Sequence, residues 1–284
     1  MYLSGVVVEQ RTLQKEVTLE GIGVHSGEEV RLTLKPSDSG RIMFRRMDLG
    51  ARETWIDPRA SEARNSTAIL AQGFRIQTVE HLLASLFAFG VGSVDIELDG
   101  GEIPIMDGSA RLFVLAIRKA CPIGIGQMEP SARIVRPVEV RQKDALVRLE
   151  PGAGFRISYG IDFSHPAIGR QELDLSLTPE VFASEIAPAR TFGFLRDAEE
   201  LRKRGLALGS SLDNAIVLDD EKVVNPPLRF PDEFVRHKIL DVIGDFALWG
   251  HPIIGRIRAE KAGHRLHSKA LQVLLDKPDA WVLD

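Results

Sequence analysis

The sequence predicts an α+β fold of two similar layered domains, each made of a sheet and two helices. Both halves of the chain begin with short stretches of alternating apolar and polar residues and continue with helical spacing. The length of 284 residues suits two domains or one large one. A Pro- and Gly-rich segment, CPIGIGQMEPSA at 121–132, is the best linker candidate. We therefore expect domains at 1–125 and 133–284.

In the first half, the apolar residues from Val79 to Phe87 recur at helical spacing. Thr78 is the candidate N-cap of that helix, which places Glu80 and His81 in its first turn. A second helix is expected to begin at Asp107. The expected strands are 17–19, 30–34, 41–46 and 93–98, and the expected helices are 78–89 and 107–120.

In the second half, the strongest helix prediction covers 232–249, which begins after Pro231 and ends before Gly250. The other expected helices are 179–187, 196–204 and 266–276. The expected strands are 133–141, 145–150, 155–162, 215–218 and 252–259.

The composition excludes several classes of protein. The formal net charge is only -4, so no global field favours nucleic acid or an anionic membrane surface. No stretch approaches the roughly 20 apolar residues of a membrane span. The start, MYLSGVVVEQRTLQ, lacks a basic region and a long apolar core, so we expect no signal peptide. The single cysteine, Cys121, forms no intrachain disulfide and suits a reducing compartment. We expect a soluble cytoplasmic protein.

The strongest helix also carries the first chemical signal. His237 and Asp241 lie four residues apart and share a helix face, so both can bind one metal ion, and Asp245 continues that face. A solvated His/Asp pair explains this spacing equally well, and taken alone it is the commoner case.

Three more segments carry further signals. Glu80 beside His81 could act as a general base next to a metal ligand, although a glutamate at a helix start also favours the helix dipole. His264, in a polar turn, could protonate a leaving amine, whereas a surface histidine is the simpler reading, as for His267. Thr191 could donate a hydrogen bond to an oxyanion, but nothing local demands it. The HExxH, G-x-S-x-G and P-loop motifs are absent.

Together and in this order, the motifs resemble those of the UDP-3-O-acyl-N-acetylglucosamine deacetylases, which perform the committed step of lipid A synthesis. The resemblance runs from Gln10 almost to the C-terminus. One departure is Asn65, where the family often has a cysteine. The matching segments are GIGVHSG (21–27), TVEHLLAS (78–85), EIPIMDGSA (102–110), IDFSHPAIG (161–169), ARTFGF (189–194), LDNAIVLDD (212–220), EFVRHKILDVIGD (233–245) and GH (263–264).

The resemblance implies a zinc-dependent deacetylase with its active site in the cleft between two α+β domains. The implied zinc ligands are His81, His237 and Asp241. Glu80 is then the general base on the attacking water, and His264 the general acid or an electrostatic partner.

Four further roles follow from the same resemblance. Thr191 would help to hold the oxyanion, and Asp245 would orient His264 or a neighbour. The implied substrate is a UDP-linked, acylated N-acetylglucosamine. Its other expected contacts are Lys238 and Lys261 with the diphosphate, Phe163 with the nucleotide, Phe192 with the sugar and acyl region, and an insertion at 163–178 as an apolar passage for the acyl chain.

Two alternatives remain open. The first is a zinc deacetylase for a different N-acetyl sugar, which Lys238, Lys261 and the apolar insertion argue against. The second is a protein that binds the lipid precursor without hydrolysing it. Glu80 and His264 argue against this second alternative, because neither is needed merely to hold the sugar. We expect a monomer with a small-molecule substrate and no nucleic-acid partner.

Overall fold

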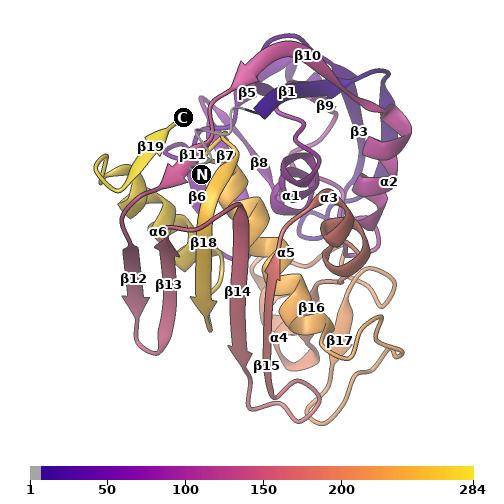
Figure 1. Cartoon of the computed structure of the whole chain (residues 1–284). Coiled ribbons are helices and arrows are strands. Elements are labelled where there is room, and N and C mark those ends of the chain that lie inside the picture. The colour runs from indigo at the N-terminus through magenta and orange to yellow at the C-terminus, as the bar shows by residue number, and fades with distance from the viewer. Residues whose placement is uncertain (1–7) are drawn as a thin grey trace.

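The computed structural model describes residues 8–284 and confirms the α+β class, with sheets and helices in both halves of the chain (Figure 1). Residues 1–7, which include much of the segment considered as a signal peptide, lie outside the described residues. No helix within 8–284 is long and apolar enough to cross a membrane. The division into domains at 1–125 and 133–284 stays a prediction. Below, residues 8–129 are called the N-terminal half and residues 130–284 the C-terminal half.

A five-stranded sheet, in the order β2-β3-β9-β4-β5, carries most of the N-terminal half. Val30, Leu32 and Leu34 of β3 are buried and alternate with more exposed residues, as expected for a strand with one face on the core. Only the β4–β9 pairing of this sheet is parallel. Its strands are β2 (Val17–Ile22), β3 (Glu29–Pro36), β4 (Ile42–Arg46), β5 (Arg52–Trp55) and β9 (Val94–Leu98).

A smaller antiparallel sheet of three strands leads into the first helix. Its strands are β6 (Ser61–Ala63), β7 (Thr67–Ala71) and β8 (Phe74–Gln77). The helices of this half are the short 3-10 turn Met47–Leu49, α1 (Glu80–Ala88) and α2 (Arg111–Ala120).

A seven-stranded sheet carries the C-terminal half, with β18 at its centre. β18 pairs antiparallel with β13 and parallel with β14 and β11. The strands are β11 (Ala132–Ile134), β12 (Val138–Gln142), β13 (Ala145–Glu150), β14 (Phe155–Asp162), β15 (Arg170–Ser176), β18 (Ile253–Glu260) and β19 (Trp281–Leu283). A separate parallel pair consists of β16 (Phe192–Phe194) and β17 (Ile216–Leu218). The helices are α3 (Pro179–Val181), a π-helix (Phe182–Ile186), α4 (Leu195–Lys203), α5 (Glu233–Ala247) and α6 (His264–Leu275).

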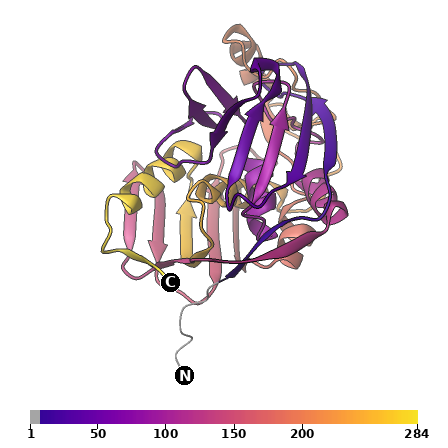
Figure 2. The same ribbon diagram turned by 90° about the horizontal axis from the view of Figure 1, so that it is seen from above.

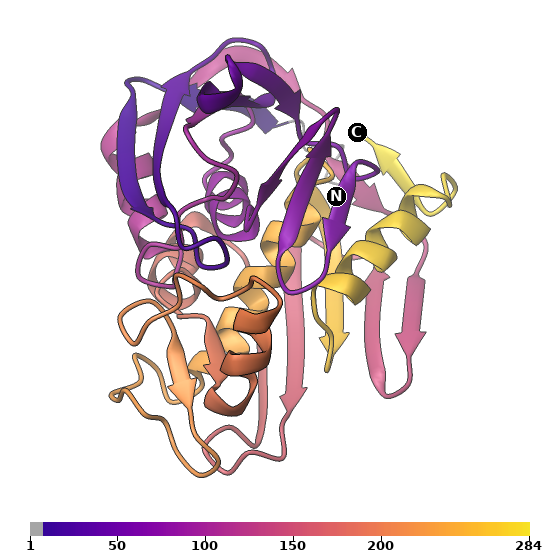
Figure 3. The same ribbon diagram turned by 180° about the vertical axis from the view of Figure 1, so that it is seen from behind.

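Helices α1 and α5 pack against each other between the two halves (Figure 3). Almost every residue of both helices is buried, so each is covered on all sides. Their backbones approach closely at Gly244, where a Cβ atom would lie 2.1 Å from the carbonyl oxygen of Glu80. Because no side chain fits there, glycine at this position allows the start of α1 to lie directly against the last turn of α5. Residues that are far apart in sequence therefore meet at this contact.

The segment 121–132 is not the irregular linker that its composition indicated. Most of it forms strand β10 (Pro122–Glu129), which pairs antiparallel with β1 (Val8–Leu13) along the edge of the N-terminal half (Figures 1 and 2). The pairing partner lies more than a hundred residues away, so local composition carried no sign of it.

Several helix predictions need correction at their ends. Thr78 does not cap α1, because its hydroxyl donates to Glu102 Oε1 at 2.8 Å and its φ is 58°. Helix α2 starts at Arg111, since Asp107 accepts hydrogen bonds from Ser109 in a turn. The strand expected at 133–141 is divided into β11 and β12. Gly250 lies two residues beyond Leu248, the C-cap of α5, and so is not the C′ residue that the sequence predicted, although its φ is 79° and its N–H bonds to the Ala247 carbonyl.

Candidate active site

Three predicted metal ligands meet where α1 contacts α5. His81 comes from α1, and His237 and Asp241 share one face of α5. Nε2 of His237 lies 3.3 Å and Nε2 of His81 lies 3.8 Å from Asp241 Oδ1. The ligand atoms of all three residues lie within 4.8 Å of one another, and all three side chains are buried. Two imidazoles and a carboxylate form a donor set that suits a divalent metal ion.

The protonation state of His237 also fits a ligand. Its Nδ1 donates to the carbonyl oxygen of Ala189 at 3.1 Å, which leaves Nε2 directed at Asp241. Burial lowers the pKa of His237, so its imidazole is neutral, the form that binds metals.

Glu80 lies in the first turn of α1, beside the ligand His81. Its Oε2 accepts a hydrogen bond from the backbone N–H of Thr67 at 3.0 Å, and its Oε1 lies 3.9 Å from His264 Nε2. Burial raises the pKa of this carboxyl, and the nearby histidines oppose that rise. The carboxyl group is thus fixed by the backbone of Thr67 on one side and faces the imidazole of His264 on the other.

His264 opens α6 and contacts Asp245, one turn beyond Asp241 on α5. The distance from His264 Nδ1 to Asp245 Oδ2 is 2.8 Å. Burial alone would lower the pKa of His264, but the carboxylates of Asp245, Asp241 and Glu80 raise it to about 10. The imidazole is therefore protonated at neutral pH and can stabilise negative charge or give up a proton.

A second group of potential ligands, Asp245, His264 and His267, is engaged in hydrogen bonds instead. His267, expected on the surface, is fully buried; its Nδ1 lies 2.7 Å from Asp245 Oδ2 and its Nε2 lies 3.0 Å from the Tyr159 hydroxyl. The prediction that His267 lies on the surface was wrong. It rested on the polar residues next to His267, whereas Tyr159, which packs on it, belongs to β14, far away in sequence.

A cavity of 770 Å³ opens onto the three ligands, Glu80 and His264. A large part of its lining comes from residues 191–217, where apolar side chains such as Leu195, Leu201 and Leu212 alternate with charged and polar ones. None of its lining residues within 8–284 belongs to 163–178, the segment predicted to form the acyl passage. Thr191 lines the cavity while its backbone is held by hydrogen bonds to Gly108 and Ile216.

Comparison with known proteins agrees with this geometry. Residues 10–276 match the family LpxC, described as UDP-3-O-acyl N-acetylglycosamine deacetylase. The chain belongs to this family. It is 46% identical over 280 residues to the UDP-3-O-acyl-N-acetylglucosamine deacetylase of Myxococcus xanthus (strain DK1622), covering 96% of this chain and 88% of that protein. It is also 44% identical over 279 residues to the enzyme of the same name from Geotalea uraniireducens (strain Rf4), covering 96% and 91% respectively.

The deacetylase family is one of hydrolases, and the structure brings most of the predicted residues of this member to one cavity. Eight of them line it: Glu80, His81, Thr191, Phe192, His237, Lys238, Asp241 and His264. Asp245 lies behind His264. Phe163 packs on Phe192 with ring centroids 5.8 Å apart and does not line the cavity. Lys261 is also outside the lining, in ion pairs with Asp162 at 2.9 Å and Asp144 at 3.3 Å.

The sequence did not indicate the residues that hold the loops around this deacetylase site in position. The Glu102 carboxylate, almost completely buried, accepts hydrogen bonds from the backbone of His25 and Ser26 and from Thr78. These bonds fix the loop that places His25 on the cavity wall. His25 and Ser26 lie in the motif GIGVHSG and Glu102 lies in EIPIMDGSA, so the sequence contained these residues but gave no sign that they contact each other.

Proposed function

We propose that the chain hydrolyses the N-acetyl group of UDP-3-O-acyl-N-acetylglucosamine, with zinc as the metal, to give UDP-3-O-acyl-glucosamine and acetate. This is the committed step of lipid A biosynthesis. The observation that carries the proposal is one cavity in which a His/His/Asp cluster, the carboxylate of Glu80 and the imidazolium of His264 face one another. Membership of the deacetylase family supports the substrate.

In this proposal each step of amide hydrolysis has its own group. Zinc, when held by His81, His237 and Asp241, would supply Lewis acidity. Glu80 accepts the proton of the attacking water, since its carboxylate faces the cavity beside His81.

Two other side chains stabilise the oxyanion and protonate the leaving amine. Thr191, which lines the same cavity, donates to the developing oxyanion. His264, protonated and held by Asp245, stabilises negative charge and gives its proton to the leaving amine.

The rest of the substrate fits the cavity by charge and polarity. Lys238, half-buried beside Asp241, supplies a cation for the diphosphate, with Lys261 as a second. In this proposal Phe192 contacts the sugar and acyl region, and Phe163, whose ring meets that of Phe192 edge to face, contacts the nucleotide. The apolar side chains of α4 and the residues before β17 form a wall for the acyl chain.

The compartment is also a proposal. The single cysteine, Cys121, is exposed and free, which suits the reducing cytoplasm.

Acetate release tests the function directly. Purified protein is incubated with UDP-3-O-acyl-N-acetylglucosamine, with a chelator, and with the chelator followed by excess zinc. We expect acetate only in the first and third reactions, and a loss of about 10²–10⁴-fold in Glu80→Gln. UDP-N-acetylglucosamine without the acyl chain should be a much poorer substrate. Equal rates on both sugars would contradict the acylated substrate, and full activity in chelator would contradict the metal.

A further inference from the structure

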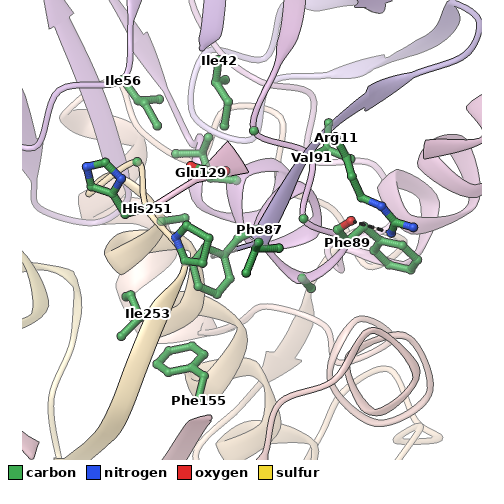
Figure 4. Close-up of a pocket in the computed structure, with 18 of the residues that line it drawn as sticks. Arg11, Ile42, Ile56, Phe87, Phe89, Val91, Glu129, Phe155, His251 and Ile253 are labelled. Atoms are coloured by element: carbon green, nitrogen blue, oxygen red, sulfur yellow. Dashed lines mark hydrogen bonds between the residues drawn. The ribbon is translucent and has the colours of Figure 1, made fainter. Parts of the chain in front are cut away.

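A second cavity, of 810 Å³, lies away from the metal cluster, at the C-terminal ends of α1 and α5 (Figure 4). Its walls are apolar and partly aromatic, with Trp55, Ile56, Phe87, Phe155 and Ile253 among them. None of the residues assigned to catalysis lines it. A cavity of this size with mainly apolar walls matches the usual dimensions of a small-molecule site.

Glu129, at the end of β10, is the unpaired charge of this cavity. Figure 4 shows its side chain over the apolar wall, above Phe87 and on the same side as His251. Within residues 8–284 its carboxylate has no hydrogen bond and no ion pair in the structure. Burial raises the pKa of Glu129 to about 7, and no neighbouring cation offsets the rise.

The other charged groups of the cavity are already engaged. Arg11 donates from Nη1 to the carbonyl oxygen of Phe89 at 3.4 Å, and the Arg41 guanidinium lies 5.5 Å from the centroid of the Trp55 ring. Glu9 accepts a hydrogen bond from the backbone of Gly126. Burial lowers the pKa of His251, so its imidazole is neutral. Of the two carboxylates that line the cavity within residues 8–284, Glu129 is therefore the one without a hydrogen bond or an ion pair.

Helix dipoles add negative potential at the same place. Phe89 and Gly90, just beyond α1, and Ala247 and Gly250, at the end of α5, all line the cavity. The C-terminal end of a helix carries partial negative charge and favours cations. Two helix ends and one unpaired carboxylate thus point to a positively charged ligand with an apolar body.

We propose that this cavity binds an organic amine, with its ammonium group at Glu129 and its apolar or aromatic body against Phe87 and Phe155. Aromatic walls suit such a ligand, because ring faces attract cations as well as burying carbon. The site is separate from the deacetylase cavity, although both are built on α1 and α5.

Three matched probes test the charge requirement: phenylpropylamine, phenylpropanol and phenylpropanoate. Binding to the metal-loaded protein is measured at pH 8 by calorimetry, and quenching of Trp55 fluorescence, compared with Trp55→Phe, reports the location. We expect the amine to bind at least about tenfold more tightly than the alcohol and the acid. Phenylpropanoate binding as tightly as the amine would overturn the proposal, as would no detectable binding of the amine.

The Glu129→Gln variant shows whether the amine binds at Glu129 or at the carboxylates of the deacetylase site. It removes the charge and keeps the shape, so the amine should lose about tenfold in affinity while acetate release stays at the parent rate. Glu221→Gln, which changes an exposed glutamate, is the matched control and should bind the amine like the parent. Unchanged amine affinity in Glu129→Gln would show that the amine binds elsewhere and would refute the assignment.

Discussion

The hydroxyl of Thr67 donates a 2.5 Å hydrogen bond to Oδ1 of Asp245, the residue that holds His264. The backbone N–H of the same threonine donates to Glu80 Oε2 at 3.0 Å. One residue at the start of β7 thus holds the proposed base directly and the proposed acid through Asp245. Because the hydroxyl and the N–H serve different partners, the two functions can be separated by mutation.

Thr67→Val should impair turnover without emptying the metal site. Valine keeps the shape and the N–H to Glu80 but removes the bond to Asp245, and a hydrogen bond to a charged group contributes ~1.5–3 kcal/mol. We expect kcat to fall roughly tenfold or more while KM and metal content stay near the parent values. Steady-state kinetics and elemental analysis measure these quantities. Thr67→Ser, which retains the hydroxyl, is the control and should remain close to the parent. A Thr67→Val enzyme with parent kcat would mean that His264 does not depend on this bond.

The sequence predicted the parts of the site that lie on regular helices. The apolar periodicity predicted a helix at 232–249, and His237, Asp241 and Asp245, four residues apart, must then lie on one face of it. The resemblance to the deacetylases supplied the pairing with His81, which no local pattern contains.

Contacts between distant segments could not be predicted in this way. Thr67 and Asp245 are 178 residues apart, and β10 depends on β1 for its pairing. His267 looked like a surface histidine because its local sequence is polar, yet Tyr159 and Asp245 enclose it. Each of these residues acquires its environment from tertiary packing, which overrides local propensity.

His237→Ala should lose most of its metal. Removing one of three ligands leaves two donors, too few for a tight catalytic site. Metal content per chain is measured by elemental analysis after dialysis. Two controls bracket the result: His165→Ala, which changes a buried histidine bonded to the Asp219 carbonyl, and His267→Ala, from the hydrogen-bonded group. Both should retain the metal. Full retention in His237→Ala would refute the ligand set, and loss in His267→Ala would place a ligand in the second group.

Lys238→Ala should weaken UDP binding more than Lys261→Ala does. Two carboxylates, Asp144 and Asp162, already neutralise Lys261, whereas Lys238, on the cavity wall, pairs with a single carboxylate of the described residues, that of Asp241. We expect a loss of about tenfold for Lys238→Ala, because a charge-assisted contact with phosphate is removed. The loss should be larger at low salt, where screening is weaker. Calorimetric titration with UDP measures it, with exposed Lys269→Ala as the control. Parent affinity in Lys238→Ala would put the diphosphate elsewhere.

Glu129→Gln should change how stability depends on pH. Burial raises the pKa of Glu129 to about 7, so the folded state holds this proton more tightly than the unfolded chain does. Stability from this group is fully present below the unfolded pKa and is lost as pH rises from about 4.5 to about 7. Glutamine is neutral throughout and has no such loss. The Tm of Glu129→Gln relative to the parent should therefore be higher at pH 8 than at pH 5, by roughly 2 °C or more.

Other titrating groups, including those around the metal cluster, are common to Glu129→Gln and the parent protein, so their effects on Tm cancel in this comparison. Glu221→Gln, an exposed glutamate, should show no such change between the two pH values. An equal difference at pH 5 and pH 8 would mean that the Glu129 carboxyl ionises as easily in the folded protein as in the unfolded chain, and the cavity would then lack the unpaired charge on which amine binding depends.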